Sequence, residues 1–284
     1  ALPAGTCRSQ IDLMTLQLTG LTVYPIKSAG GIPVSDWPVD EFGLRYDRRW
    51  MLVDDSGEFL SQRSHPRLAL ARPSIRDGSL RIDAPGMPSL ELPLEPTASV
   101  TTDVTVWNDT CPAAWLGERP ASWFSDFLGS SCSLVYMTGE TLRPADPAYA
   151  PDGTRVSFAD AFPFLIISEE SLADLNRRLA RPLPMNRFRP NLVVAGGAPY
   201  QEDLWERIEI NGIGIRVVKP CARCVVTTTD QVTAEQGREP LRTLATYRQI
   251  SGKVMFGQNA VHERTGRLRV GDAVLVTASV RPAV

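Results

Sequence analysis

Residues 208–217, which read IEINGIGIRV, decide the fold class of this chain. Apolar residues alternate with other residues on both sides of Asn211-Gly212, so each arm presents one apolar face. Asn-Gly is the strongest short hairpin signal, because both central residues of a type I′ turn need a positive φ. Similar runs occur at residues 18–24, 49–53, 79–83 and 103–107. The sequence therefore predicts a mainly β protein with a few helices, built from antiparallel strands.

Three helices are expected among these strands. One begins after Ser168, a good N-cap residue, and carries three leucines at helical spacing. The other two span residues 120–127 and 240–247. Hairpins alone fill the first hundred residues, whereas strands alternate with helices from about residue 130, as in a chain of two domains. A long stretch rich in Pro, Asp and Ala, residues 141–157, indicates a surface loop.

The composition of the 284 residues excludes several classes of protein. Hydrophobic residues make up 43% and charged residues 22%, as in ordinary globular proteins, and the net charge is −2. No basic field exists that would hold nucleic acid. The longest apolar run, residues 162–167, is far shorter than the roughly twenty residues of a membrane span, so no membrane partner is expected. Five cysteines, an odd number, favour a reducing compartment and a cytoplasmic protein. Residues 1–13 carry no periodic pattern and are expected to be a leader or a cloning remnant.

The most distinctive segment, KPCARCVVTTTD at residues 219–230, holds a C-x-x-C pair. A structural zinc site needs two more Cys or His ligands, and no second close pair exists. A redox dithiol needs a helix N-terminus, whereas the β-branched residues 225–229 predict a strand. Two buried cysteines beside a strand remain an alternative. However, Lys219 and Arg223 flank the pair and favour a thiolate, a soft ligand suited to molybdenum or copper.

Three other segments place cations next to strands. YPIKSAGG at 24–31 has the composition of an anion nest, in which Ser and Gly amides join Lys27, but an ordinary hairpin turn is the more common structure for such a segment. In DRRW at 47–50, alternation puts Arg48 and Arg49 on opposite faces, and we expect an inward arginine to need an anion. NRFRPN at 186–191 precedes an apolar strand, where its arginines either bind a ligand or remain solvated.

Taken together, these segments resemble the MOSC family, and the resemblance extends from Leu16 to Val276. YPIKSAGG, DRRWMLVD, ESLADLNRRL, FRPNLVV, PCARCVVTTTD and the closing FGQNA…GRLRVGDAV occur in the order found in its larger members. These members are the mitochondrial amidoxime reducing component and bacterial YcbX-like proteins. The resemblance implies an N-terminal MOSC β-barrel domain at 14–110, a connecting helical segment at 111–130 and a MOSC β-barrel domain at 131–284.

The same resemblance implies a molybdenum cofactor, a pterin dithiolene with a terminal phosphate, in the cleft between the domains. Cys224 would be the catalytic residue and the molybdenum ligand, with Cys221 as a neighbour that does not bind the metal. The remaining implied cofactor contacts are Lys27, Ser28 and Arg48 at the phosphate end, and Asp160, Ala161, Arg189 and Asn191 beside the pterin.

The implied reaction is a two-electron reduction of N-hydroxylated small molecules such as amidoximes, hydroxylamines and N-hydroxylated bases. No cysteine cluster for an Fe–S centre follows the last strand, so electrons are expected from a separate ferredoxin, flavoprotein or cytochrome. Neither histidine, His65 or His262, lies in a matched segment that would make it the general acid. Two alternatives remain open: a sulfur carrier with a persulfide on Cys221 or Cys224, and a molybdopterin carrier without turnover.

Overall fold

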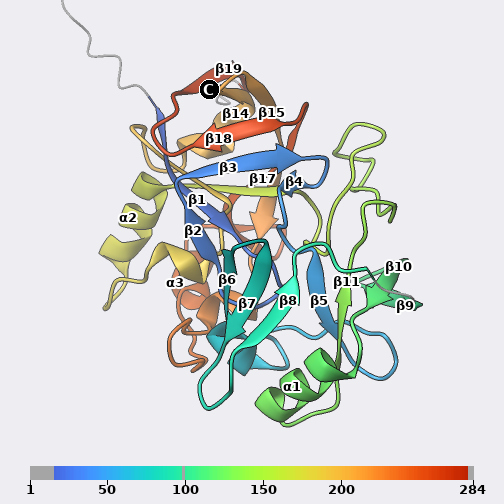
Figure 1. Cartoon of the computed structure of the whole chain (residues 1–284). Helices are drawn as coiled ribbons and strands as arrows, with labels where there is room; N and C mark the ends of the chain where they lie inside the picture. Colours follow the sequence, from blue (N-terminus) through green and yellow to red (C-terminus); the bar gives the residue numbers. More distant parts are fainter. Residues whose placement is uncertain (1–15, 98–99, 281–284) are drawn as a thin grey trace, which may run out of the picture.

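The computed structural model describes residues 16–97 and 100–280, so the expected leader or remnant at 1–13 lies outside the described residues. The described chain is mainly β, as predicted, and its strands form one large and three small sheets (Figure 1). The helices are α1 (Glu118–Leu128), α2 (Glu169–Arg178) and α3 (Leu241–Ala245). Short 3₁₀ turns lie at Pro66–Leu70, Met185–Arg187, Gln201–Leu204 and Val225–Thr228.

The large sheet has the strand order β19-β14-β15-β17-β12-β13-β1-β2, with β16 attached to β17. Its pairs are antiparallel except β12 with β13. Residues 208–217 lie in the β14–β15 hairpin, where Asn211 has φ 47° and Gly212 φ 72°, which confirms the predicted turn. The bounds are β1 (Gln17–Val23), β2 (Ile32–Val34), β12 (Phe164–Ser168), β13 (Leu192–Ala195), β14 (Trp205–Ile210), β15 (Ile213–Ala222), β16 (Gln249–Ile250), β17 (Lys253–His262) and β19 (Val274–Ser279).

Three smaller sheets complete the fold. Their orders are β5-β11-β10-β9, β18-β3-β4 and β6-β7-β8. The bounds are β3 (Asp36–Asp40), β4 (Gly43–Leu44), β5 (Trp50–Val53), β6 (Arg72–Arg76), β7 (Ser79–Asp83), β8 (Leu90–Pro93), β9 (Thr101–Val106), β10 (Asp109–Trp115), β11 (Ser133–Tyr136) and β18 (Gly266–Arg269).

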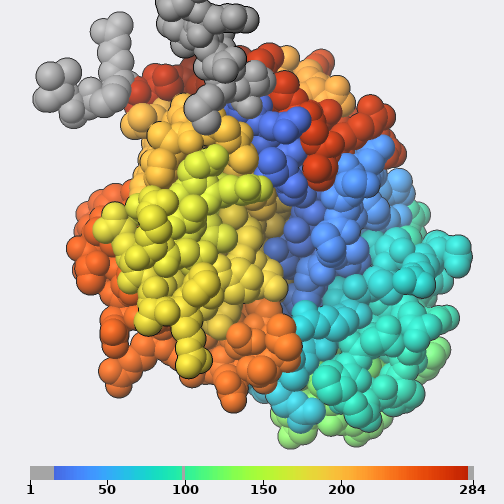
Figure 2. All heavy atoms as spheres, turned by 90° about the vertical axis from the view of Figure 1, so that its left-hand side faces the viewer, coloured from blue at the N-terminus to red at the C-terminus, as the bar shows by residue number. Residues whose placement is uncertain are grey.

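The two halves of the chain interleave at their sheets. β1 pairs with β13 and β3 pairs with β18, so strands from the two halves share the same sheets. Figure 2 shows the two halves side by side on one face, with the yellow and orange segments against the blue and cyan ones. The domain bounds 14–110, 111–130 and 131–284 remain predictions.

Helix α2 begins at a residue whose side chain caps it. The Ser168 hydroxyl accepts a hydrogen bond from the backbone N–H of Ser171, which confirms the predicted N-cap of α2. Leu175 of this helix is buried together with Phe188 and Phe256. A separate core around Trp50, with Phe124 and Phe127 of α1, fills the first half of the chain. The candidate site is lined by residues from both halves of the chain.

Gly257 of β17 offers a test of this packing. Its φ is +80°, and an added Cβ would lie 2.6 Å from the side chain of Ile167 and 2.9 Å from the carbonyl oxygen of Ile166. Gly257→Ala should therefore lower the free energy of unfolding by about 2–4 kcal/mol, from backbone strain and overpacking combined. Chemical denaturation measures this loss. Gly252→Ala is the control, because Gly252 has φ +76° but no atom within 4 Å of its added Cβ; an equal loss in both variants would contradict the packing argument.

Candidate functional site

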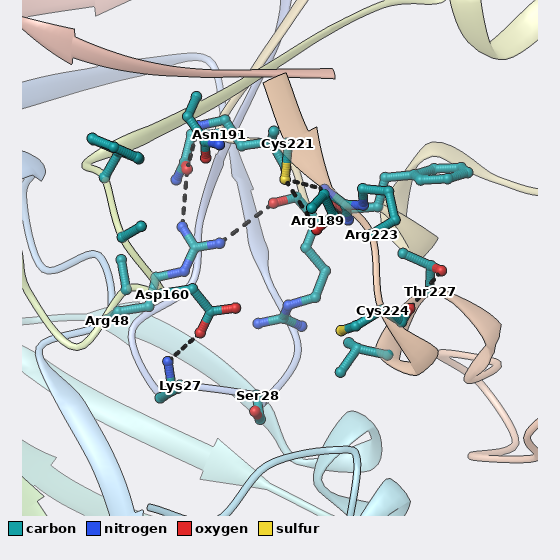
Figure 3. A pocket seen from close by; sticks show the side chains of 18 of the residues that line it. Lys27, Ser28, Arg48, Asp160, Arg189, Asn191, Cys221, Arg223, Cys224 and Thr227 are labelled. Carbon is teal, nitrogen blue, oxygen red and sulfur yellow. Dashed lines mark hydrogen bonds and ion pairs between the residues drawn. The ribbon is translucent and has the colours of Figure 1, made fainter. Parts of the chain in front are cut away.

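A cleft lined by residues from both halves of the chain contains a cavity of about 130 Å³. Its wall combines the loops after β1 and β15 and on both sides of β5 with the loops before β12 and β13. Every residue that the family resemblance implied for the cofactor lines this cavity: Lys27, Ser28, Arg48, Asp160, Ala161, Arg189, Asn191 and Cys224. Figure 3 shows the Arg189 guanidinium between the Lys27–Asp160 pair and the Cys224 sulfur in this view. Segments far apart in the sequence thus meet at one site.

Lys27 and Asp160 form an ion pair at the wall of the cavity. The Lys27 ammonium lies 2.6 Å from Asp160 Oδ1 and also donates to the carbonyl of Phe158. The Lys27 side chain is 5% exposed and that of Asp160 62% exposed. Burial lowers the pKa of Lys27 to about 8, although the carboxylate opposes this shift. Desolvation would raise the pKa of Asp160, but Lys27 and Arg63 outweigh it and hold that pKa well below its usual range.

The backbone around Ser28 differs in part from the expected nest. Ser28 is in the left-handed region, with φ 69°, and its carbonyl accepts a hydrogen bond from Gln62. The Gly30 amide donates to the carbonyl of Ala71 rather than pointing to a ligand, so the expectation of glycine amides in the nest is wrong for Gly30. Gly31 is required for space, because a Cβ there would lie 2.5 Å from the Tyr24 ring.

Arg48 is held by a buried network beside the cavity. Its guanidinium donates to Asp47 and to Asn191 Oδ1, and the Asn191 amide donates in turn to Asp47. Burial raises the pKa of Asp47, and the Arg48 charge opposes that rise. Asn191 also donates to Thr22 and accepts from the Leu165 amide, so in this arrangement its amide orients Arg48.

Arg49 contradicts one expectation from the sequence. It is buried, yet the carbonyl of Met137 accepts its hydrogen bonds and it lies over the Phe42 and Tyr136 rings. An inward arginine therefore does not need an anion here, because a carbonyl and two aromatic faces replace one. β5 begins only at Trp50, so Arg48 lies in the preceding turn with φ 49°.

Arg189 is the most deeply buried cation of the cavity wall that lacks a carboxylate partner among the described residues. Its Nη1 donates to the carbonyl of Ala29 at 2.6 Å, and the guanidinium lies over the Tyr24 ring. Burial lowers the pKa of Arg189 to about 10, and neighbouring Arg48 adds to this effect. Because the Arg189 guanidinium is buried without a carboxylate partner in the described part of the chain, it favours the binding of an anion in the cavity.

Cys221 of PCARC lies near the end of the hairpin arm β15, Cys224 follows that strand, and both are free thiols. The predicted strand at residues 225–229 is wrong, because Val225–Thr228 form a 3₁₀ turn with Cys224 at its N-cap position. The hydroxyls of Thr227 and Thr228 donate to the carbonyls of Cys224 and Val225, an alternative to strand pairing that these residues permit. The turn places Cys224 in the cavity wall.

Different arginines contact the two sulfurs. Arg223 Nη1 lies 3.0 Å from Cys221 Sγ, whereas Arg63 Nη2 lies 3.2 Å from Cys224 Sγ. The sequence did not single out Arg63, because it belongs to no cationic motif and reaches Cys224 across 161 residues. Arg223, which is adjacent to Cys224 in the sequence, therefore contacts the sulfur of Cys221.

The donor set of the cavity fits an anionic group with a soft metal. Five cationic side chains line it, against the single carboxylate of Asp160: Lys27, Arg48, Arg63, Arg189 and Arg223. Arg223 Nε is buried without a hydrogen-bond partner in the described structure. No group of three or more His, Cys, Asp or Glu that could hold a metal ion occurs within residues 16–97 and 100–280. The Cys224 thiol suits a metal whose other ligands come with a cofactor.

The Lys27 pKa gives a pH prediction. Because burial lowers the pKa of Lys27 to about 8, the Lys27 ammonium loses its proton as the pH rises through 8. A lysine with the ordinary pKa of 10.5 would stay charged over this range. The affinity of the cofactor-free protein for sulfate, whose charge is constant here, should fall about tenfold from pH 7 to pH 9. Titration calorimetry measures this. Lys27→Arg should remove the decline, and a decline of the same size in that variant would contradict the assignment.

Comparisons with known proteins found family models, relatives and solved structures that are similar to this chain. A family described as the MOSC N-terminal beta barrel domain matches residues 15–131, and the MOSC domain matches residues 153–275. Mitochondrial amidoxime-reducing component 1 of Homo sapiens is 35% identical over 272 residues, covering 89% of this chain and 81% of that protein. Molybdenum cofactor sulfurase of Oryza sativa subsp. japonica is 34% identical over 270 residues, covering 88% of this chain but only 33% of the relative. The crystal structure of YUAD protein from Bacillus subtilis covers 92% of this chain and 94% of its own, at 14% identity and a TM-score of 0.43. Among the described helices, none has both the length and the apolar content to cross a membrane.

Proposed function

The chain belongs to the MOSC protein family that includes the amidoxime-reducing components, and from this premise we propose that it is a molybdenum-cofactor-dependent reductase of N-hydroxylated compounds. The observation that carries the proposal is the Cys224 thiol in the wall of a cavity lined by five cations and one carboxylate. A phosphorylated pterin dithiolene matches both features, because it brings negative charge and a metal that binds sulfur. The relatives named for amidoxime reduction supply the reaction class.

Different residues of the cleft would contact different parts of the cofactor. Cys224 would bind molybdenum, while Lys27, Ser28 and Arg48 would hold the phosphate end. Asp160, Ala161, Arg189 and Asn191 would lie beside the pterin. The Lys27 ammonium is already paired with Asp160, so a phosphate at this position would compete with a carboxylate that is 62% exposed.

When bound, the cofactor would supply two-electron oxygen-transfer chemistry that no side chain of this cleft supplies. The chain itself would orient the substrate beside Cys224 and hold permanent positive charge around it. For an amidoxime, two electrons and two protons convert the N–OH group to N–H and release one water. The electrons would come from a separate ferredoxin, flavoprotein or cytochrome, and a cytoplasmic location remains part of this proposal.

A turnover assay tests the proposal. The protein, produced in a host that makes the molybdenum cofactor, should convert benzamidoxime to benzamidine with a chemically reduced dye as electron source. A protein that contains the cofactor but shows no turnover would instead be a carrier. A protein that lacks molybdenum but has persulfide on Cys221 or Cys224 would be a sulfur carrier, and either result would overturn the reductase assignment.

A further inference from the structure

Arg63 is a cation of the cleft that none of the proposed cofactor contacts uses. It lies between Leu60 and the 3₁₀ turn Pro66–Leu70, in the first half of the chain, and its side chain lines the cavity. Its Nη2 is 3.2 Å from the sulfur of Cys224, and the nearest carboxylate oxygen, Asp160 Oδ2, is 3.9 Å away. The side chain is 28% exposed, so some of its five N–H donors are open to a small molecule that enters the cleft.

Trp107 fixes the position of the Arg63 guanidinium. The guanidinium carbon lies 4.4 Å from the centre of the Trp107 ring, and Trp107 Nε1 donates to Asp160 Oδ1 at 3.2 Å. Phe59 supports the same indole, with ring centres 5.0 Å apart. Arg63 is thereby held over an aromatic face that two further groups keep in place.

The backbone at Trp107 is unusual for a bulky residue. Trp107 occupies the turn between β9 and β10 with φ 59°, and 44% of it is exposed. A positive φ is a true outlier for a bulky side chain, and such strained positions collect at functional sites. An exposed, strained tryptophan that is used to orient an arginine points to a role for that arginine beyond packing.

We propose that Arg63 is a substrate-binding residue that donates hydrogen bonds to the oxygen of the N–O bond being broken. The proposal rests on the proposed function, because Cys224 marks where the reacting atoms would lie. Arg63 is the cation in contact with the Cys224 sulfur, whereas Lys27 and Arg48 are paired with Asp160 and Asp47. Trp107 is then a positioning residue that acts through Arg63.

A hydrogen-bond donor at this position would assist the chemistry of the step. In the reduction of an amidoxime the N–O bond breaks, an N–H bond forms, and the oxygen leaves as water after uptake of two electrons and two protons. The external donor protein supplies the electrons, and solvent supplies the protons. The Arg63 guanidinium remains protonated throughout and stabilises the negative charge that develops on the departing oxygen.

Arg63→Met in the molybdenum-loaded protein tests the proposal. The kcat for benzamidoxime should fall about 100-fold, as when a hydrogen-bond donor to a developing oxyanion is removed, with molybdenum and pterin contents unchanged. Arg63→Lys should retain more activity, because it preserves the charge but loses the planar fork of donors. Arg67→Met is the matched control, because Arg67 is an exposed arginine of the same segment that stacks on Phe127 and does not line the cavity.

Ligand binding to the oxidised protein gives a readout that does not depend on turnover. Calorimetry would compare benzamidoxime with benzamidine, which lacks the oxygen. Arg63→Met should lower the preference for benzamidoxime about tenfold relative to the wild type and Arg67→Met. Trp107→Phe should retain the preference and Trp107→Ala should lose it.

The possible failures are distinguishable. Wild-type protein that does not reduce benzamidoxime would refute the proposed function itself. Unchanged kcat and an unchanged preference in Arg63→Met would overturn the role of Arg63 while the reductase assignment stands. Loss of molybdenum or pterin from Arg63→Met would also overturn it, because Arg63 would then hold the cofactor and not the substrate.

Discussion

Replacement of Cys224 by serine is expected to reduce N-hydroxylated substrate turnover by more than 100-fold and to lower the bound molybdenum. Mutation of groups that only support a metal ligand costs about 10–100-fold, so loss of the ligand itself should exceed that range. The serine hydroxyl is a much weaker ligand for a soft metal site than the thiolate it replaces. Turnover with a reduced dye and the molybdenum content of the purified variant measure the effect.

Cys221→Ser is the matched comparison. Cys221 lies three residues away in the same motif, but its sulfur contacts Arg223 rather than Arg63, so this variant should retain most of the activity. Equal loss in both variants would contradict a single metal ligand and favour a dithiol or persulfide site.

The second large effect is expected from reversal of charge at the phosphate end. Lys27→Glu combined with Arg48→Glu changes the charge at the cavity wall by four units and should lower the bound pterin at least about 30-fold. This corresponds to the 2–5 kcal/mol typical of a disrupted buried charge pair. Fluorescence of the oxidised pterin released from the purified protein measures the content.

Two further variants support the interpretation of that result. Lys253→Glu with Arg264→Glu makes the same change in net charge at exposed positions outside the cavity, and should leave the pterin content unchanged. Lys27→Met with Arg48→Met removes the cations without adding carboxylates beside the buried Asp47, so it addresses the risk of unfolding. Wild-type pterin content in both cavity variants would show that the phosphate lies elsewhere.

Local patterns predicted much of the fold. The alternation around Asn211-Gly212 predicted the β14–β15 hairpin, and Ser168 predicted the start of α2. These succeed because the turn and the cap depend on a few adjacent residues. The pairings of β1 with β13 and of β3 with β18 were not predictable in this way, because they join segments about 170 and 230 residues apart and depend on the whole sheet.

The candidate site was predictable to a similar extent. The cofactor residues carried over from the family resemblance all line one cavity, although their individual roles remain predictions. Propensity failed at Val225–Thr228, where threonine hydroxyls bond to the backbone and form a 3₁₀ turn in place of a strand. It also gave no signal for Arg63, whose contact with Cys224 exists only after the two halves of the chain fold together.

The central claim is that the Cys224 thiol holds the molybdenum of a pterin cofactor, and quantitative metal and pterin analysis tests it most directly. Protein purified from a host that makes the cofactor should contain about one molybdenum and one pterin per chain, and Cys224→Ser should lose the metal. Wild-type protein from the same host that is free of molybdenum and pterin, or a Cys224→Ser variant with undiminished molybdenum, would contradict the account.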